Sequence, residues 1–403
     1  MKLGLLVPRY GEEVVGGTEH WLRLLLEHLC ADRGWAAEVF TTTAVSAETW
    51  ADDYPATTTT VKGVTVHRFA SRSGRNPEYL HQLPRLRADP AGFSPGEAME
   101  YVRLVGPVCP DAVAAAEGSN CDLVAVTPYL YWPTVVGVPA LGRRVLFHGA
   151  AHDEPELQLP VMERVFGAVG GFAFNTYSER ALVEKTFRVG HLPSAIVGNA
   201  VDEGAGDPMA ARAALGLGRD EPFVLCLGKV ERAKGSVGLA SLWRMYRARR
   251  PDAPRLVFIG PVHDQGIASA ADAGVILAGR QPDAVKWGAL TACSLLIAPS
   301  GQESFSLVVL EAWLSGRPVL VNGRCQPTVE HCRRSGGGLW FEDYGDFEVA
   351  VDRLLADPEL GAALAARGHA YTRSEFAWPA LLDRYEALAG RVLAGRVLAG
   401  TGR

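Results

Sequence analysis

Two glutamates, Glu303 and Glu311, stand eight residues apart in a segment that changes from polar to apolar between them. Residues 305–314 have the leucine spacing of a helix, and Ser304 and Ser306 are of the type that caps a helix N-terminus. The N–H groups at such an end point outward and attract phosphate. Carboxylates accept hydrogen bonds from sugar hydroxyls. The segment therefore predicts a site for a ligand with phosphate at one end and several hydroxyls elsewhere; the alternative is a solvated surface helix.

Two lysines, Lys229 and Lys234, follow an apolar strand predicted over residues 223–227, and a helix is expected after Gly235. Cations at the carboxyl end of a strand can hold a pyrophosphate group. Lysine supplies a point charge there rather than the bidentate contact of an arginine. The pattern predicts a pyrophosphate clamp, and the alternative is a solvated basic turn.

A glycine turn, Gly16 and Gly17, joins a predicted strand over residues 3–8 to a leucine-rich helix over residues 21–29. Glycine lets the backbone come close to a ligand, so this layout suits a phosphate. The spacing is not G-x-G-x-x-G, which argues against a dinucleotide-binding site. A tight strand–helix turn without a ligand is the alternative.

Two histidines follow another predicted strand, which covers residues 145–147. Ligands bind beyond the carboxyl ends of strands in open α/β sheets. We prefer His148 to His152 as a site residue because it comes first after the strand. The alternative for either residue is a purely structural histidine.

Strands and helices alternate in two series, and the length of 403 residues is that of two domains. The first series occupies residues 1–198 and the second residues 199–378. Residues 379–403 are expected to add a final helix, ending near residue 389, and a frayed tail that repeats a five-residue unit. The predicted fold class is α/β with two Rossmann-like doubly wound domains.

Three stretches of the first series need separate interpretation. Residues 71–96 carry four prolines and little periodicity, and we interpret them either as a loop region that faces a substrate or as a variable surface loop. Residues 98–117 are interpreted as one helix. Residues 123–142 contain no charged residue but three prolines, which favours a buried strand, a loop and a short helix over a membrane span.

Composition narrows the class of protein. The chain is 48% hydrophobic and 21% charged, as expected for a globular protein with a large core. Its net charge of −5 provides no field for nucleic acid. The seven cysteines include no C-x-x-C pair, and no secretory leader is recognised at the N-terminus, so we expect reduced thiols and a cytoplasmic protein. We expect no metal site.

The whole pattern resembles the retaining GT-B glycosyltransferases of family GT4, the group 1 glycosyl transferases. The segment from Glu303 to Glu311, followed by the sequence GRPV at residues 316–319, resembles the E-x7-E motif of that family. The GGTE turn resembles the family's first loop. Lys234 matches the family lysine, whereas Lys229 stands where an arginine is usual.

The resemblance implies a GT-B fold, in which the first domain binds the acceptor and an interdomain cleft receives the donor. It implies retaining transfer of a sugar from a UDP- or GDP-sugar to a hydroxyl of a glycan, lipid or small molecule, without a metal or other cofactor. The residues implied around the donor diphosphate are Gly16, Gly17, Lys229, Lys234, Ser304, Phe305, Ser306 and Leu307.

Three further roles are implied by the same resemblance. Glu311 would bind the nucleotide ribose, Glu303 the hydroxyls of the transferred sugar, and His148 would support that sugar from the other domain. The alternatives are a nucleotide-sugar epimerase, a sugar phosphorylase, an NAD-dependent oxidoreductase and a non-catalytic sugar-binding relative. Peripheral contact with a membrane and the oligomeric state are left open.

Overall fold

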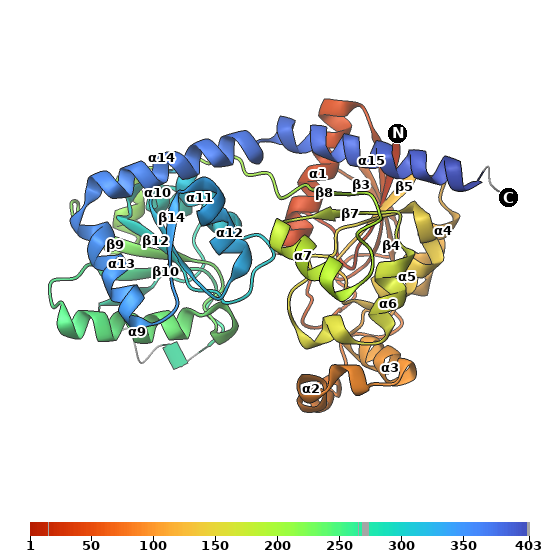
Figure 1. The fold of residues 1–403 in the computed structure, drawn as a ribbon, viewed down its shortest axis with the longest axis horizontal. Coiled ribbons are helices and arrows are strands. Elements are labelled where there is room, and N and C mark those ends of the chain that lie inside the picture. The colour runs from red at the N-terminus through yellow and green to blue at the C-terminus, as the bar shows by residue number, and fades with distance from the viewer. Residues whose placement is uncertain (15, 265, 268–273, 401–403) are drawn as a thin grey trace. The chain divides into compact units, whose positions relative to one another are not determined.

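The computed structural model describes residues 1–14, 16–264, 266–267 and 274–400, with side chains up to residue 396. The chain divides into two compact units. One unit comprises Met1–Gly198 with Leu381–Arg403, and the other comprises Asn199–Ala380. Each unit is built around its own mainly parallel sheet (Figure 1).

The first sheet, among the described residues, has eight strands in the order β3-β4-β2-β1-β5-β6-β7-β8. The β3–β4 pair is antiparallel, whereas the other neighbours are parallel. The strands are β1 (Lys2–Leu6), β2 (Ala36–Thr42), β3 (Thr58–Val61), β4 (Val64–Phe69), β5 (Leu123–Val126), β6 (Val145–Phe147), β7 (Gly171–Phe174) and β8 (Ser194–Ile196).

The helices of the first unit bury apolar faces against this sheet and one another. Helix α1, for example, buries Trp21 and four leucines. The α-helices are α1 (Gly17–Arg33), α2 (Tyr79–Ala88), α3 (Pro95–Val105), α4 (Pro110–Gly118), α5 (Trp132–Leu141), α6 (Val161–Ala168) and α7 (Tyr177–Thr186). The strand, loop and short helix predicted over residues 123–142 are therefore confirmed.

Two predictions in this unit are wrong. The single helix expected over residues 98–117 is two helices, because Gly106 has a φ of 70° and prolines follow it at 107 and 110. The stretch 71–96 is not a continuous loop, since it contains helix α2, a 3₁₀ turn and the start of α3. One of its four prolines, Pro84, lies inside α2.

The sheet of the second unit has the order β11-β10-β9-β12-β13-β14 among the described residues, and its printed pairs are all parallel. Its strands are apolar on both sides, as expected when helices cover both faces. The strands are β9 (Phe223–Leu227), β10 (Arg255–Ile259), β11 (Val275–Leu277), β12 (Leu295–Ala298), β13 (Val319–Asn322) and β14 (Gly338–Phe341).

The helices of the second unit include three that the sequence analysis did not predict, α8, α12 and α14. All three contribute buried side chains to the unit. The α-helices are α8 (Pro208–Ala214), α9 (Ser236–Arg249), α10 (Asp283–Ala292), α11 (Leu307–Leu314), α12 (Gln326–Ser335), α13 (Tyr344–Ala356) and α14 (Pro358–Glu375).

The final helix, α15 (Trp378–Gly400), is longer than expected, and the prediction of a frayed tail is wrong. From Leu381 onward it belongs to the first unit. Val392 packs so closely on Gly171 that a Cβ there would lie 2.6 Å from its Cγ2 atom. Arg391 donates a hydrogen bond to the carbonyl oxygen of Ser194, 2.9 Å away. The repeated tail therefore makes both apolar and polar contacts with β7 and β8.

Both sheets reverse their strand order at one place, between β1 and β5 in the first unit and between β9 and β12 in the second. In open α/β sheets ligands bind beyond the carboxyl ends of the strands at such a switch point. Each unit therefore has one preferred edge for a site.

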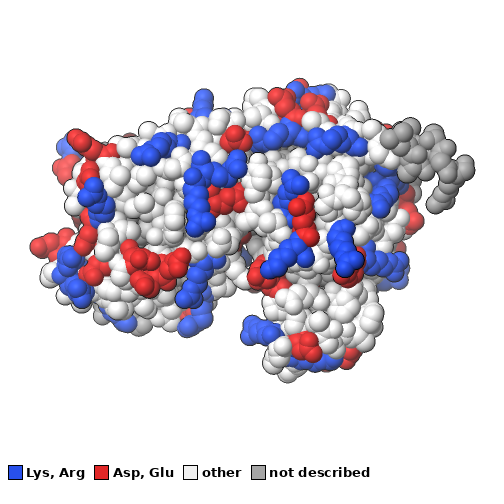
Figure 2. Space-filling model, in the orientation of Figure 1, with Lys and Arg blue, Asp and Glu red and all other residues white. Residues whose placement is uncertain are grey.

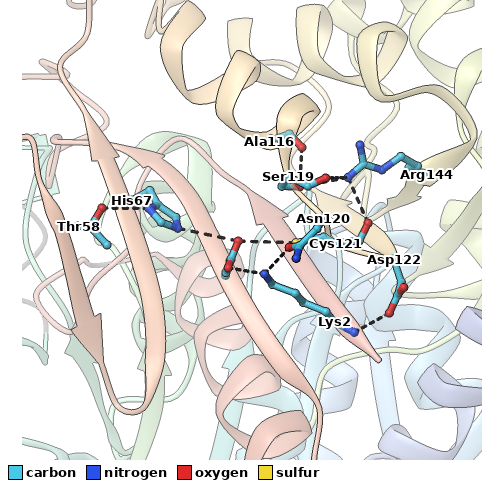
Figure 3. A network of polar contacts seen from close by, with 10 residues as sticks. Lys2, Thr58, His67, Ala116, Ser119, Asn120, Cys121, Asp122 and Arg144 are labelled. Atoms are coloured by element: carbon cyan, nitrogen blue, oxygen red, sulfur yellow. Dashed lines mark hydrogen bonds and ion pairs between the residues drawn. The ribbon is translucent and has the colours of Figure 1, made fainter.

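The opposite, amino edge of the first sheet is closed by side chains (Figure 3). Lys2 donates from its backbone N–H to Asp122, at 2.7 Å, and its ammonium contacts Glu38. Arg144 donates to the carbonyl oxygens of Ser119 and Cys121, at 2.9 and 3.2 Å. The Lys2 contacts hold the start of β1 beside β5 and β2, and the Arg144 contacts hold the start of β6 beside the segment that enters β5.

Charged side chains of both signs are interspersed on the face of each unit seen in Figure 2. Among the described residues, no helix combines the length and the apolar character needed to cross a membrane.

Candidate active site

The turn after β9 carries the two lysines predicted to bind a diphosphate. Lys229 is exposed, and its carbonyl oxygen accepts a hydrogen bond from the Ser236 hydroxyl at 3.2 Å. Lys234 ends a 3₁₀ turn, Arg232–Lys234. Gly235 follows with a φ of 73°, and a Cβ on it would lie 2.3 Å from the Pro299 carbonyl oxygen. Glycine at this position therefore lets the turn after β9 pack directly on the loop after β12.

The loop after β12 is held by its own polar contacts. The Ser300 hydroxyl donates to the carbonyl oxygen of Gln302 at 2.8 Å, and the Asn322 amide donates to that of Pro299 at 2.9 Å. Ser306 adopts the left-handed conformation, with a φ of 75°. Such strain in a non-glycine residue is often found at functional sites.

Helix α11 begins at Leu307, not at Phe305 as expected, because the left-handed Ser306 cannot continue a right-handed helix. The prediction that serine side chains cap it is also wrong, since the N-cap Ser306 makes no side-chain capping bond. The first-turn N–H groups of a helix need partners from elsewhere, and an anion can supply them. The start of α11 thus keeps its predicted suitability for phosphate.

Each glutamate of the E-x7-E segment is paired with a lysine. The Lys234 ammonium lies 3.0 Å from an oxygen of Glu303, and the Lys286 ammonium lies 2.9 Å from an oxygen of Glu311. Lys286 belongs to α10 and also lies 4.7 Å from the centroid of the Trp287 ring. The side chain of Glu311 is 14% exposed and that of Glu303 is 22% exposed, so both retain access to solvent.

The sequence analysis missed Lys286. The only available signal was one cation among the otherwise apolar residues 284–290, and this does not reveal its partner.

Phe305 fixes the loop after β12 through buried aromatic contacts. Its ring is buried and packs edge-on against His331 of α12, at 4.8 Å, and against Phe376, at 5.0 Å. The Nδ1 atom of His331 lies 3.1 Å from the Tyr371 hydroxyl of α14. Burial lowers the pKa of His331 to about 3, so the imidazole is neutral at pH 7. Two unpredicted helices, α12 and α14, therefore position the loop.

In the first unit, the predicted glycine turn lies at the start of α1. Gly16 is its N-cap, and a Cβ there would lie 2.2 Å from a carboxylate oxygen of Glu19. Glu19 in turn forms an ion pair with Arg9. A Cβ on Gly17 would meet no described atom within 4 Å, which is compatible with the close approach of a ligand.

His148 follows β6, as predicted, but its side chain is buried. Its Nε2 atom lies 3.0 Å from the hydroxyl of Tyr385 on α15, whose ring stacks on the imidazole. The ring of Trp21 lies 5.5 Å away between centroids. Burial lowers the pKa of His148 to about 3, which makes it neutral at pH 7. Tyr385 was not predicted, because 237 residues separate the two.

The loop that follows His148 is held by a buried carboxylate on α7. Glu179 accepts hydrogen bonds from the N–H groups of Ala151, at 2.9 Å, and Asn175, at 2.7 Å. Ala150 has a φ of 51°, which is unfavourable for alanine. Glu179 thus stabilises the loop that carries His152, whose side chain is partly exposed.

The predicted site residues fall into two groups. Lys229, Lys234 and the segment 303–311 lie together at the switch point of the second sheet. Gly16, Gly17 and His148 lie in the first unit. Among the described residues, no group of three His, Cys, Asp or Glu side chains is placed to hold a metal ion.

Residues 209–370 match the protein family described as Glycosyl transferases group 1. The second unit is a glycosyl transferases group 1 domain. The family predicted from the E-x7-E segment is thereby confirmed on this part of the chain.

Sequence relatives agree with this family. The D-inositol 3-phosphate glycosyltransferase of Segniliparus rotundus is 32% identical over 192 residues, which are 44% of this chain and 42% of that protein. The chain spans about half the length of the curated relatives that it matches.

Solved structures are similar in fold to both units of the chain. Sucrose-phosphate synthase from Thermosynechococcus elongatus has a TM-score of 0.72 at 19% identity, covering 98% of this chain and 100% of that one. HepE of Anabaena, in complex with UDP, has a TM-score of 0.67 at 17% identity, covering 97% and 100%. At these identities the likeness concerns the fold, and the predicted GT-B fold class is confirmed.

Proposed function

We propose that this protein transfers a sugar from a nucleotide-diphosphate sugar to a hydroxyl acceptor, with retention of the anomeric configuration. The observation that carries the proposal is the pair of lysine–glutamate contacts, Lys234 with Glu303 and Lys286 with Glu311, beside the start of α11. Together they offer cations for phosphate and carboxylates for hydroxyls at one switch point.

The diphosphate is assigned to the cationic part of this site. Lys234 and Lys229 supply charge from the turn after β9, and the backbone N–H groups of residues 304–307 supply donors at the start of α11. Both kinds of group stabilise the negative charge that grows on a departing diphosphate. The reaction then needs no metal ion, and activity should persist in EDTA.

The carboxylates are assigned to the two sugars of the donor. Glu311 binds the ribose hydroxyls, and Lys286 holds its carboxylate in place at 2.9 Å. Glu303 binds hydroxyls of the transferred sugar beside the diphosphate, because Lys234 contacts it directly. A histidine of the loop after β6, His148 as predicted or its alternative His152, supports the sugar.

The comparisons suggest the first ligands to test. HepE was solved with UDP and with UDP-glucose, which supports a UDP-sugar donor. The name of the Segniliparus relative supports a soluble polyol phosphate among the acceptors to be tried. All seven cysteines are free, which supports a reducing compartment such as the cytoplasm.

A thermal-shift screen with UDP, GDP, ADP and their sugars tests the donor. A nucleotide at 100 times its Kd should stabilise the protein by about 2.7 kcal/mol. The same shift should be lost in Lys234→Ala and kept in Arg232→Ala, a neighbour that is 82% exposed. The proposal would be abandoned if no nucleotide raised the melting temperature.

An acceptor assay with the selected donor then separates the alternatives. A glycosyltransferase releases nucleotide diphosphate in proportion to acceptor consumed. An epimerase turns over without an acceptor, and a phosphorylase requires inorganic phosphate.

A further inference from the structure

Four segments of the first unit meet around Trp50 at the switch point of the first sheet. Trp50 is 2% exposed, and its indole N–H donates to the Val105 carbonyl oxygen at 2.8 Å. The ring of Tyr131, which follows β5, contacts it edge-on at 5.0 Å between centroids. Trp50 is therefore a fixed platform beyond β1, β2 and β5.

Two guanidinium groups lie beside the Trp50 ring. The Arg9 guanidinium carbon is 5.8 Å from the ring centroid, and that of Arg75 is 5.4 Å away. Arg75 also lies 5.5 Å from the centroid of the Tyr79 ring. Cation–π contacts of this kind fix the position of a guanidinium but leave its N–H groups to find acceptors.

The two arginines differ in how their charge is balanced. Arg9 pairs with Glu19 and donates to the Val45 carbonyl oxygen at 2.9 Å. Arg75, by contrast, forms no ion pair with any carboxylate of the described residues, and its buried Nε atom has no hydrogen-bond partner among them. One positive charge at this place is therefore not compensated, although an unpaired charged group is costly to remove from water.

Tyr131 and Arg75 both lie beside the Trp50 ring, with the Tyr131 ring 5.0 Å and the Arg75 guanidinium carbon 5.4 Å from its centroid. Burial raises the pKa of Tyr131, and the Arg75 guanidinium opposes that rise. Tyr131 is also the N-cap residue of α5, and its side chain makes no capping bond. The positive end of that helix therefore begins at Tyr131.

We propose that Arg75 and Tyr131 bind a negatively charged group of the sugar acceptor, with a phosphate ester as the best-fitting class. A guanidinium offers phosphate two parallel hydrogen bonds, and the Tyr131 hydroxyl offers a third donor. The inference rests on the proposed function and adds a substrate class to it. Arg75 comes from residues 71–96, for which an acceptor-facing role was one of two sequence interpretations, and the donor diphosphate already has its own cations in the second unit.

Matched pairs of acceptors test the inference in the full-length protein. Inositol and inositol 3-phosphate, and glucose and glucose 6-phosphate, are compared with the donor chosen by thermal shift. The wild-type kcat/KM should be at least tenfold higher for one phosphorylated member than for its neutral partner. Arg75→Gln should abolish that preference, whereas UDP should still raise its melting temperature.

The matched control is Arg72→Gln, three residues earlier, whose side chain is 65% exposed and faces Asp111 at 3.5 Å. It should keep the wild-type preference. Tyr131→Phe removes only the hydroxyl and should lower kcat/KM for the phosphorylated acceptor severalfold, which keeps the test valid if Arg75→Gln fails to fold.

Two results would overturn the inference: equal use of neutral and phosphorylated acceptors by the wild type, or an unchanged preference in the Arg75 and Tyr131 variants. Either result with UDP still stabilising the protein leaves the proposed function intact. A protein that no nucleotide stabilises would instead remove the proposed function itself.

Discussion

The Lys234 ammonium lies 3.0 Å from a carboxylate oxygen of Glu303, although 69 residues separate them in the sequence. The contact joins the turn after β9 to the loop after β12, the two segments that flank the switch point of the second sheet. The side chains are 40% and 22% exposed, and ion pairs of this kind contribute only about 0–1 kcal/mol to folding. The Lys234–Glu303 contact therefore matters mainly because it places a cation and a carboxylate side by side for a ligand.

Replacing Lys234 by alanine should impair donor use far more than folding. We expect the donor kcat/KM to fall at least a hundredfold, because a cation at the leaving diphosphate acts most strongly as charge develops. The melting temperature should change little. Steady-state kinetics and thermal unfolding check both parts, with Arg232→Ala of the same turn as the control. A variant with wild-type kcat/KM would remove Lys234 from the site.

The two glutamates should differ in their kinetic signatures. Glu311→Gln should raise the donor KM with little change in kcat, because ribose contacts are the same in the ground and transition states. Glu303→Gln should mainly lower kcat, because contacts to the reacting sugar strengthen as it develops charge. Glu359→Gln, an exposed position on α14, is the control. Identical losses in both variants would show that the roles are not divided in this way.

Local patterns in the sequence were enough to find strands of both sheets, among them β1, β5, β6 and β9, and the E-x7-E segment. Apolar runs mark buried parallel strands, and a motif within nine residues does not depend on distant contacts. The partners of the motif were not predictable, since Lys286 reaches Glu311 only after α10 and α11 pack together. The same holds for Tyr385, which reaches His148 from the last helix.

Errors in the predicted elements have specific causes. The helix expected over residues 98–117 is interrupted at Gly106, and the prolines at 107 and 110 were a local signal of this break that the apolar spacing outweighed in the prediction. The expected start of α11 was displaced by the left-handed Ser306. The prediction of a frayed tail rested on the short repeat alone. The tail is instead helical, with Val392 packed on Gly171 and Arg391 hydrogen-bonded to Ser194.

Substitutions of the two histidines after β6 should have different effects, one on stability and the other on catalysis. His148→Ala should lower the free energy of unfolding by about 2–4 kcal/mol, because it leaves a cavity between Trp21 and Tyr385 and an unpaired hydroxyl. His152→Ala should lower kcat with little change in stability, if its partly exposed ring supports the sugar. Denaturant unfolding and kinetics of both variants decide the matter. A fully stable His148→Ala with a collapsed kcat would restore His148 as the sugar-binding residue.

Acid should destabilise the protein from about pH 6.5 downward. Burial lowers the pKa of His148 and His331 from 6.5 to about 3, so between these values the unfolded chain binds more protons than the folded one. Stability is therefore fully present above pH 6.5 and is lost as the pH falls, by about 1.4 kcal/mol per pH unit for each histidine. Melting temperatures at pH 7, 6 and 5 measure the effect.

The matched variant is His331→Phe, which keeps an aromatic ring beside Phe305 and removes the titrating group. It should make the pH dependence of the melting temperature between pH 7 and 5 about half as steep, because His148 still contributes. A slope identical to that of the wild type would mean that His331 titrates normally in the folded protein.

The anomeric configuration of the product tests the mechanism as a whole. An inverting enzyme needs a general base on the face opposite the leaving group. Glu303 and Glu311 instead lie with Lys234 and Lys286, which we assign to the donor's own side. A double displacement would need a carboxylate nucleophile on the opposite face. Glu154 of the first unit is poorly suited to that role, because burial raises its pKa and it already accepts a hydrogen bond from Tyr129.

The remaining route has the acceptor hydroxyl attack from the face of the leaving group. The bond from the sugar to the diphosphate oxygen breaks, the bond to the acceptor oxygen forms, and the departing diphosphate takes the acceptor proton. Lys234 and the start of α11 stabilise the charge on that diphosphate. An α-linked donor should therefore give an α-linked product. Proton NMR of the first product, recorded before mutarotation, measures this configuration, and a β product would require a base that the proposed site does not contain.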